Sequence, residues 1–139
     1  KNDVKEKNSR LMLNFGHTFA HAIESSLDNN LSNQKEILRH GEAVGLGLLC
    51  EIYYTHGKNK IFYEIKNLLN LYLLPTNLKF IKINKNLLKK EIFKYIFLDK
   101  KKIGKFPRYI SLKSAGNPKI SELSNNVKIK KTIDNVLFS

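Results

Sequence analysis

The pattern of apolar and polar positions predicts a mainly helical chain. Apolar residues recur at helical spacing in five stretches, and these are residues 10–26, 41–55, 59–73, 84–98 and 126–138. The stretch at 41–55 is apolar on nearly every face, so we expect it to be the buried central helix. Gly45 and Gly47 within it each cost about 1 kcal/mol relative to alanine, and close packing against another backbone would explain them.

Polar and helix-breaking residues separate these stretches. Gly57 suits a C-terminal stop for the central helix, Pro75 ends the next one, and residues 27–39 begin as a polar turn rich in Asn and Ser. On the three later helices the same spacing predicts the inward-facing residues, which are Ile61, Phe62, Ile65, Leu68, Leu69, Leu87, Leu88, Ile92, Tyr95, Ile96, Val127, Ile133, Val136 and Leu137.

One region has the alternation of strands rather than helical spacing. Residues 108–113 alternate like a short strand, and residues 119–123 could pair with them. The predicted fold class is therefore mainly α, with a short β-hairpin near residues 108–123.

The first helix carries an unusual row of polar residues. If residues 10–24 form one helix at about 100° per residue, Arg10, Asn14, His17 and His21 fall within roughly 60° of one another, and Glu24 lies near the edge of that arc. Burying such a row without partners would cost several kcal/mol. We therefore expect it to face a metal, an anion or a wet cleft.

Length and composition exclude several classes of protein. At 139 residues the chain is long enough for one domain with its own core, which we assign to residues 1–139. The lone Cys50 excludes a disulfide framework and a multi-cysteine metal site, and it fits a reducing compartment. No secretory signal and no membrane-spanning apolar run is visible, so we expect a cytoplasmic protein without a membrane partner.

The net charge of +13 raises the question of a polyanionic partner. The lysines are dispersed among Asn and Ile throughout the chain, and they form no basic stripe interleaved with aromatic residues. A general compositional bias explains them better than nucleic-acid binding does. Part of the charge can also serve a small anionic substrate.

Three constellations could carry chemistry. His17 and His21 are four residues apart and so share a helix face, but Thr18 stands where the metalloprotease motif requires Glu, and on its own the pair is weak evidence for a metal. His40 lies at a helix N-terminus, which favours anions, although a plain capping or structural histidine explains it equally well. The residues at 99–102, Asp-Lys-Lys-Lys, place cations at a helix C-terminus, where a solvated basic turn is the ordinary alternative.

Together, these stretches indicate one protein family far more specifically than any one of them does alone. The sequence resembles the 3-dehydroquinate synthase family in residues 3–6 and 10–24, in His40 to Gly45, in Leu74-Pro75-Thr76 and in Asp99 to Lys101. The order agrees along essentially the entire chain. The resemblance covers the C-terminal, helical half of such an enzyme, and we expect the Rossmann-like N-terminal NAD-binding domain to be absent from this chain.

The resemblance implies a reaction. Enzymes of this family convert 3-deoxy-D-arabino-heptulosonate 7-phosphate into 3-dehydroquinate and phosphate, in the shikimate route to aromatic amino acids. They reduce and reoxidise NAD within one turnover and hold the substrate on a divalent metal, normally zinc. A homodimer is implied for the full-length enzyme. The chain alone is then expected to bind zinc weakly and to be inactive.

The resemblance also implies roles for individual residues. His17 and His40 would be metal ligands, the third ligand being a glutamate of the N-terminal half. Glu24 is a candidate to orient one of these two imidazoles. The implied catalytic and substrate-binding residues are Arg10, Asn14 and His21, with Lys100 or Lys101 as a further anion contact.

The sequence departs from the usual family pattern at individual positions. Ala20 stands where the family usually has Gly, and Arg39 stands where an apolar residue is common.

Other functions are alternatives to the synthase. A synthase making another cyclitol, or a metal-dependent alcohol or glycerol dehydrogenase, would use a related helical domain. A basic helical domain that binds nucleic acid is a further alternative, and it gives His17 and His40 no role.

Overall fold

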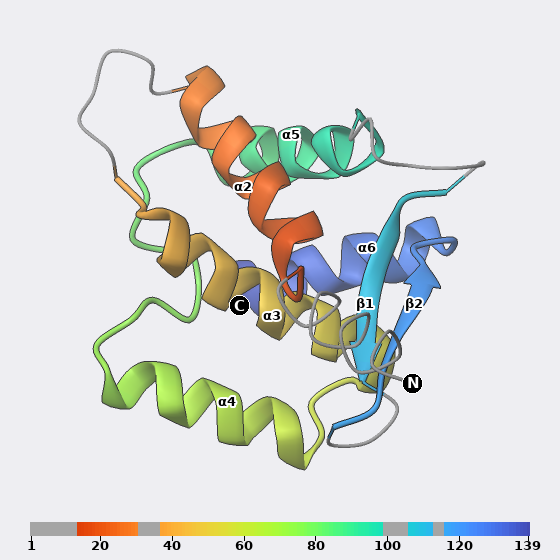
Figure 1. Cartoon of the computed structure of the whole chain (residues 1–139). Helices are drawn as coiled ribbons and strands as arrows, with labels where there is room; N and C mark the ends of the chain where they lie inside the picture. Colours follow the sequence, from red (N-terminus) through yellow and green to blue (C-terminus); the bar gives the residue numbers. More distant parts are fainter. Residues whose placement is uncertain (1–13, 31–36, 99–105, 113–115) are drawn as a thin grey trace.

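The structure, a computed structural model, describes residues 14–30, 37–98, 106–112 and 116–139. Figure 1 shows several helices packed together, with a two-stranded sheet beside them. The elements in chain order are α2 (His17–Asn30), α3 (His40–His56), α4 (Lys60–Leu71), α5 (Lys85–Leu98), β1 (Arg108–Leu112), β2 (Pro118–Glu122), α6 (Asn126–Thr132) and the π-helical turn η1 (Ile133–Leu137). The predicted mainly α class with a short hairpin is confirmed.

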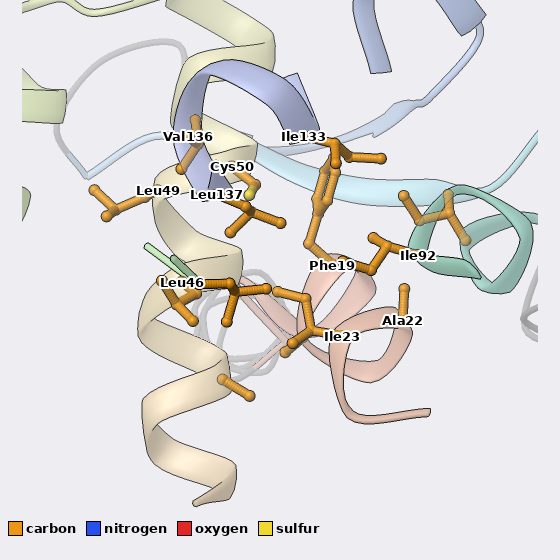
Figure 2. Packing of buried hydrophobic residues seen from close by; sticks show 14 of the residues in the cluster. Phe19, Ala22, Ile23, Leu46, Leu49, Cys50, Ile92, Ile133, Val136 and Leu137 are labelled. Carbon is orange, nitrogen blue, oxygen red and sulfur yellow. The ribbon is translucent and has the colours of Figure 1, made fainter. Parts of the chain in front are cut away.

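Helix α3 is the central element, as predicted from its uniformly apolar sequence. It packs against α2, α4, β1, α6 and η1, and α2 and α4 lie on different sides of it (Figure 1). Figure 2 shows the core where these elements meet. The buried residues in this part of the core include Phe19, Ile23, Leu46, Leu49, Cys50, Ile92, Ile133, Val136 and Leu137. Full burial of each large apolar side chain stabilises the fold by about 1.5–3 kcal/mol.

A very close backbone approach joins the start of α2 to the middle of α3. A Cβ atom built on Gly47 would lie 1.9 Å from the Gly16 carbonyl oxygen and 2.9 Å from the Ala20 nitrogen. A Cβ on Gly16 would lie 2.7 Å from the Val44 carbonyl oxygen, and Gly16 also has a φ of +83°. Only glycine fits both positions. The predicted backbone contact is thus found at Gly47, whereas Gly45 faces the flexible side chain of Leu69.

The predicted hairpin is confirmed, with antiparallel pairing from Arg108↔Glu122 to Leu112↔Pro118. Strand β1 packs against α3, where the Tyr109 hydroxyl lies 2.9 Å from the Thr55 hydroxyl oxygen. Strand β2 is largely exposed. A proline at its first residue is compatible with an outer strand, because no ladder donor is then needed there.

Asparagine caps fix where three helices begin. The side-chain oxygens of Asn59, Asn84 and Asn125 each accept a hydrogen bond from the backbone N–H three residues later, at 2.9, 3.1 and 3.0 Å. Such caps stabilise a helix by about 1 kcal/mol relative to alanine. Some of the many asparagines therefore serve the helix starts.

The first helix differs from its prediction. Residues 14–16 form a turn, and α2 begins at His17 because Gly16 takes a left-handed conformation. Asn14 therefore does not share one continuous helix face with His17 and His21, and the single helical row from Arg10 to Glu24 was wrong at this point. Arg10 itself lies outside the described residues. The helix also ends later than Ser26, at Asn30.

Three predicted inward residues are exposed instead. Leu68, Leu87 and Val127 face solvent, whereas Phe62, Leu88, Ile92, Ile96, Ile133, Val136 and Leu137 are buried as predicted. Helical periodicity predicts an apolar stripe on each helix that is wider than the part its neighbours bury. No helix of the described residues is long and apolar enough to cross a membrane.

The Gly16–Gly47 contact gives a prediction about stability. Gly47→Ala should lower the free energy of unfolding by about 3 kcal/mol, because its methyl group meets backbone atoms that cannot move aside. Gly41→Ala is the matched control, since nothing lies within 4 Å of its Cβ position, and we expect a change below about 1 kcal/mol. Denaturant unfolding followed by circular dichroism measures both, and equal effects would contradict the packing.

Candidate functional site

Three imidazoles meet where α2 begins and where α3 begins. The ring centroids of His17 and His21 are 5.6 Å apart, those of His17 and His40 are 5.5 Å apart, and those of His21 and His40 are 6.4 Å apart. The first pair lies on one helix face, as the four-residue spacing predicted. His40 is the first residue of α3, so the fold brings it to this pair from the other helix. We call these three residues the histidine cluster.

Two rings of the cluster are held through their Nδ1 atoms. Nδ1 of His17 lies 3.2 Å from the Phe15 carbonyl oxygen, and Nδ1 of His40 lies 2.8 Å from Oε1 of Glu24. Both partners are acceptors, so they favour the tautomer that carries its proton on Nδ1. Nε2 of each ring then keeps its lone pair, which is the arrangement of a metal-ligating histidine with an oriented ring.

The cluster is open to a ligand or to another part of the protein. The His40 side chain is 59% exposed and the Glu24 side chain 30% exposed, and His17 and His21 are partly buried.

The N-terminus of α3, where His40 lies, is capped by Glu42, whose Oε2 accepts a hydrogen bond from the Arg39 N–H at 3.0 Å. This is one half of a capping box.

The donor set suits part of a metal site. Neutral imidazoles are good zinc ligands, and a catalytic zinc site takes three protein ligands. Among the described residues, no group of three or more His, Cys, Asp or Glu side chains is placed to hold a metal ion. The Nε2 atoms of His17 and His40 are suitable donors for two positions of such a site.

Of the other predicted site residues, the structure describes only Asn14. Arg10, Lys100 and Lys101 lie outside the described residues. Asn14 is exposed, and its backbone carbonyl accepts a hydrogen bond from the His17 N–H at 3.2 Å. Their roles stay predictions.

Cys50 is a core residue, as its place in the apolar helix predicted. Its side chain is fully buried, and this burial raises the pKa of the thiol well above its ordinary value. A buried protonated thiol is a poor nucleophile. Cys50 therefore packs as a small hydrophobe.

Sequence reasoning missed Glu51. This carboxyl group is fully buried in the middle of α3, and its Oε2 accepts a hydrogen bond from the Gly16 N–H at 2.7 Å. Burial raises the pKa of Glu51 well above its ordinary value, against the lowering effect of the Gly16 and Thr18 backbone N–H groups. The available signal was a single acidic residue in the otherwise apolar run from Leu46 to Tyr54.

The first turn of α2 also contacts the hairpin. The Thr18 hydroxyl donates a hydrogen bond to the Arg108 carbonyl oxygen at 2.7 Å. Helix α3 and strand β1 thus both hold the residues that flank His17.

The raised pKa of Glu51 predicts a pH dependence of stability. Below the ordinary value of 4.5 the carboxyl is protonated in both the folded and the unfolded chain. As the pH rises above 4.5, the unfolded chain loses this proton first, so the folded chain is progressively destabilised, by at most about 1.4 kcal/mol per pH unit. Glu51→Gln removes this titration, so its stability relative to the wild type should increase with pH from about 4.5 upward.

Unfolding of both proteins between pH 4 and pH 8 measures this difference. The thiol of Cys50 and the phenol of Tyr109 have pKa values raised above 9.0 and 10.0, so they keep their protons over this range. A difference in stability that stays constant across the range would contradict the buried, neutral carboxyl.

Comparison with known proteins places the chain in a family. The model of the 3-dehydroquinate synthase C-terminal domain matches residues 1–102. A 3-dehydroquinate synthase of Clostridium botulinum is 36% identical over 120 residues, covering 84% of this chain and 31% of the relative. Those of Chlorobium chlorochromatii and Clostridium acetobutylicum are 36% identical over 124 residues and 31% identical over 139 residues, covering 83% and 94% of this chain.

The chain spans about a third of the length of these curated relatives, 31% of the first two and 34% of the third. The family match includes α2 and α3 and so the whole histidine cluster. The resemblance seen in the sequence is therefore confirmed, and the chain belongs to the 3-dehydroquinate synthase C-terminal family.

Proposed function

We propose that this chain supplies the metal- and substrate-binding part of a 3-dehydroquinate synthase. The reaction converts 3-deoxy-D-arabino-heptulosonate 7-phosphate into 3-dehydroquinate with release of phosphate, on the shikimate route to aromatic amino acids. The observation that carries the proposal is the meeting of His17, His21 and His40, with two of these rings oriented through Nδ1. The names of the relatives support the same activity.

In this proposal His17 and His40 hold a divalent metal, zinc in the first instance, through their Nε2 atoms. A bound metal lowers the pKa of coordinated hydroxyl groups and polarises the substrate. Glu24 accepts the Nδ1 proton of His40, which fixes that ring and raises the basicity of its Nε2. The third ligand is a glutamate of the N-terminal NAD-binding domain, which we place outside this chain.

The remaining residues handle the anionic substrate and its protons. His21 lies next to both proposed ligands, where it can exchange a proton with a substrate oxygen or hydrogen-bond to it. Arg10 can grip a carboxylate or a phosphate through two parallel hydrogen bonds. Asn14 offers a donor and an acceptor, and Lys100 or Lys101 adds a second cation.

The partners of the chain follow from the same proposal. NAD binds mainly to the N-terminal domain, and the complete enzyme is a cytoplasmic homodimer. With one ligand and the NAD site outside it, this chain binds zinc weakly and is inactive by itself. Assays of the complete protein with this sugar phosphate, with other cyclitol precursors and with glycerol separate the synthase from the related cyclitol synthases and polyol dehydrogenases.

The ligand assignment predicts the effect of removing each imidazole. In the complete protein, His17→Ala and His40→Ala should each weaken zinc binding by more than about 100-fold, since losing a ligand exceeds the 10–100-fold cost of losing an outer partner. Synthase activity should fall with the bound zinc. Competition with a chelator and metal analysis measure the affinity.

His56→Ala is the matched control for these variants. His56 ends α3 at the opposite end from His40, and its Nε2 contacts the Leu112 carbonyl oxygen. We expect zinc affinity within about threefold of the wild type. Normal zinc binding by both His17→Ala and His40→Ala would reject the assignment.

The contact between Glu24 and His40 predicts a graded effect. Glu24→Ala should weaken zinc binding by about 10–100-fold, because the His40 ring loses its oriented Nδ1 contact. Glu24→Gln keeps a carbonyl oxygen that can accept the Nδ1 proton, so it should lose less. Isothermal titration of the complete protein with zinc compares the two, and equal losses would argue against ring orientation as the cause.

A further inference from the structure

The N-terminus of α2 is held by a side chain from another helix. The first N–H groups of a helix have no partner within the helix and need an acceptor from elsewhere. Phe15 and Gly16 precede α2, and neither has a polar side chain to serve as a cap. An acceptor comes instead from Glu51, 35 residues further along the chain, whose Oε2 accepts a hydrogen bond at 2.7 Å from the N–H of Gly16, the residue directly before α2.

A second backbone group at this helix start interacts with the same carboxyl. The Thr18 N–H acts on Glu51 together with the Gly16 N–H. These two residues flank His17 directly.

Gly47 and Glu51 act on α2 from one face of α3, because residues four apart are neighbours on a helix. Gly47 lets the backbone of α2 come close, with the Gly16 carbonyl oxygen where its Cβ would be. Glu51, one turn later, bonds the N–H of the same glycine. Helix α3 therefore carries His40 itself and also holds the backbone on which His17 stands.

Burying the Glu51 carboxyl group costs free energy, and packing alone does not require this group. It is fully buried, and its Oε1 atom has no hydrogen-bond partner among the described residues. An apolar side chain of similar length would fill the space without the cost of desolvating a carboxyl group. The other oxygen of Glu51, Oε2, is taken up by the hydrogen bond from the Gly16 N–H.

We propose that Glu51 is a positioning residue that sets how His17 meets His40, by capping the start of α2 from within the core. In its effect on metal binding, this inference rests on the proposed function. In its effect on the backbone at Gly16, it stands independently of that function.

The test compares Glu51→Met with Glu51→Gln in the complete protein. Methionine keeps the length of the side chain but lacks an oxygen acceptor, whereas glutamine keeps an acceptor for the Gly16 N–H. We expect Glu51→Met to speed amide hydrogen exchange at residues 16–19 by about tenfold or more and to weaken zinc binding by about 10–100-fold, as for the loss of an outer-shell partner. Glu51→Gln should keep both within about threefold of the wild type.

A merely structural role is separated by a control and by a spectrum. Val136→Ala removes core volume from η1, a different element from α2, and should lower the melting temperature without changing zinc affinity. In the cobalt-substituted protein, Glu51→Met should shift the visible absorption bands, and Val136→Ala and Glu51→Gln should not. Wild-type zinc affinity and an unchanged spectrum in Glu51→Met, with its exchange at residues 16–19 also unchanged, would overturn the inference.

Two further outcomes keep the inference and the proposed function apart. If His17→Ala and His40→Ala leave zinc binding intact, the proposed function fails, and hydrogen exchange at residues 16–19 alone decides the role of Glu51. If Glu51→Met does not fold, the wild type decides: a slowly exchanging Gly16 amide supports the inference, and one that exchanges at the rate of an unstructured peptide overturns it.

Discussion

The backbone contact between Gly16 and Gly47 is the constraint on which the rest of the structure depends. It places the start of α2 directly on α3, at a distance that no side chain at either position would allow. Residues of both helices then lie together in the apolar core, among them Phe19 and Ile23 from α2 and Leu46 from α3 (Figure 2). The packing thus fixes the relation of the two helices before any functional residue is considered.

The histidine cluster is a consequence of that relation. His17 follows Gly16 directly, His21 lies one turn further along α2, and His40 begins the helix on which α2 rests. Local acceptors then set the rings, with the Phe15 carbonyl on one side and the Glu24 carboxylate on the other. Two imidazoles with free Nε2 lone pairs are the donors that the proposed metal site requires, and the His40 side chain is open to solvent.

Much of the fold could be predicted from local patterns. Helical spacing predicted the helices, alternation predicted the hairpin, and the apolar run of α3 predicted the central element, because burial imposes each of these patterns on the sequence. The start of α2 could not be predicted this way, since Gly16 interrupts the helix through a left-handed conformation that nothing in the spacing of the apolar residues shows. The exposure of Leu68 and Val127 depends on how much of each helix a neighbour covers, which is a tertiary property.

The site was predictable in part for the same reason. The pairing of His17 with His21 follows from helix geometry, whereas the approach of His40 depends on how two helices pack, and it was anticipated only through the family resemblance. Glu51 was missed because its partner is a backbone N–H 35 residues away. A lone acidic residue one turn after a helical glycine is a signal worth reading in such apolar helices.

The assignment of His17 and His40 as ligands is tested most directly by a crystal structure of the complete protein grown with zinc, with diffraction data collected on both sides of the zinc absorption edge. We expect an anomalous peak within bonding distance, about 2.0–2.1 Å, of Nε2 of both His17 and His40, with the Nδ1 atom of His40 still bonded to Glu24. A zinc peak elsewhere, or His17 and His40 rings turned apart around no metal, would contradict it.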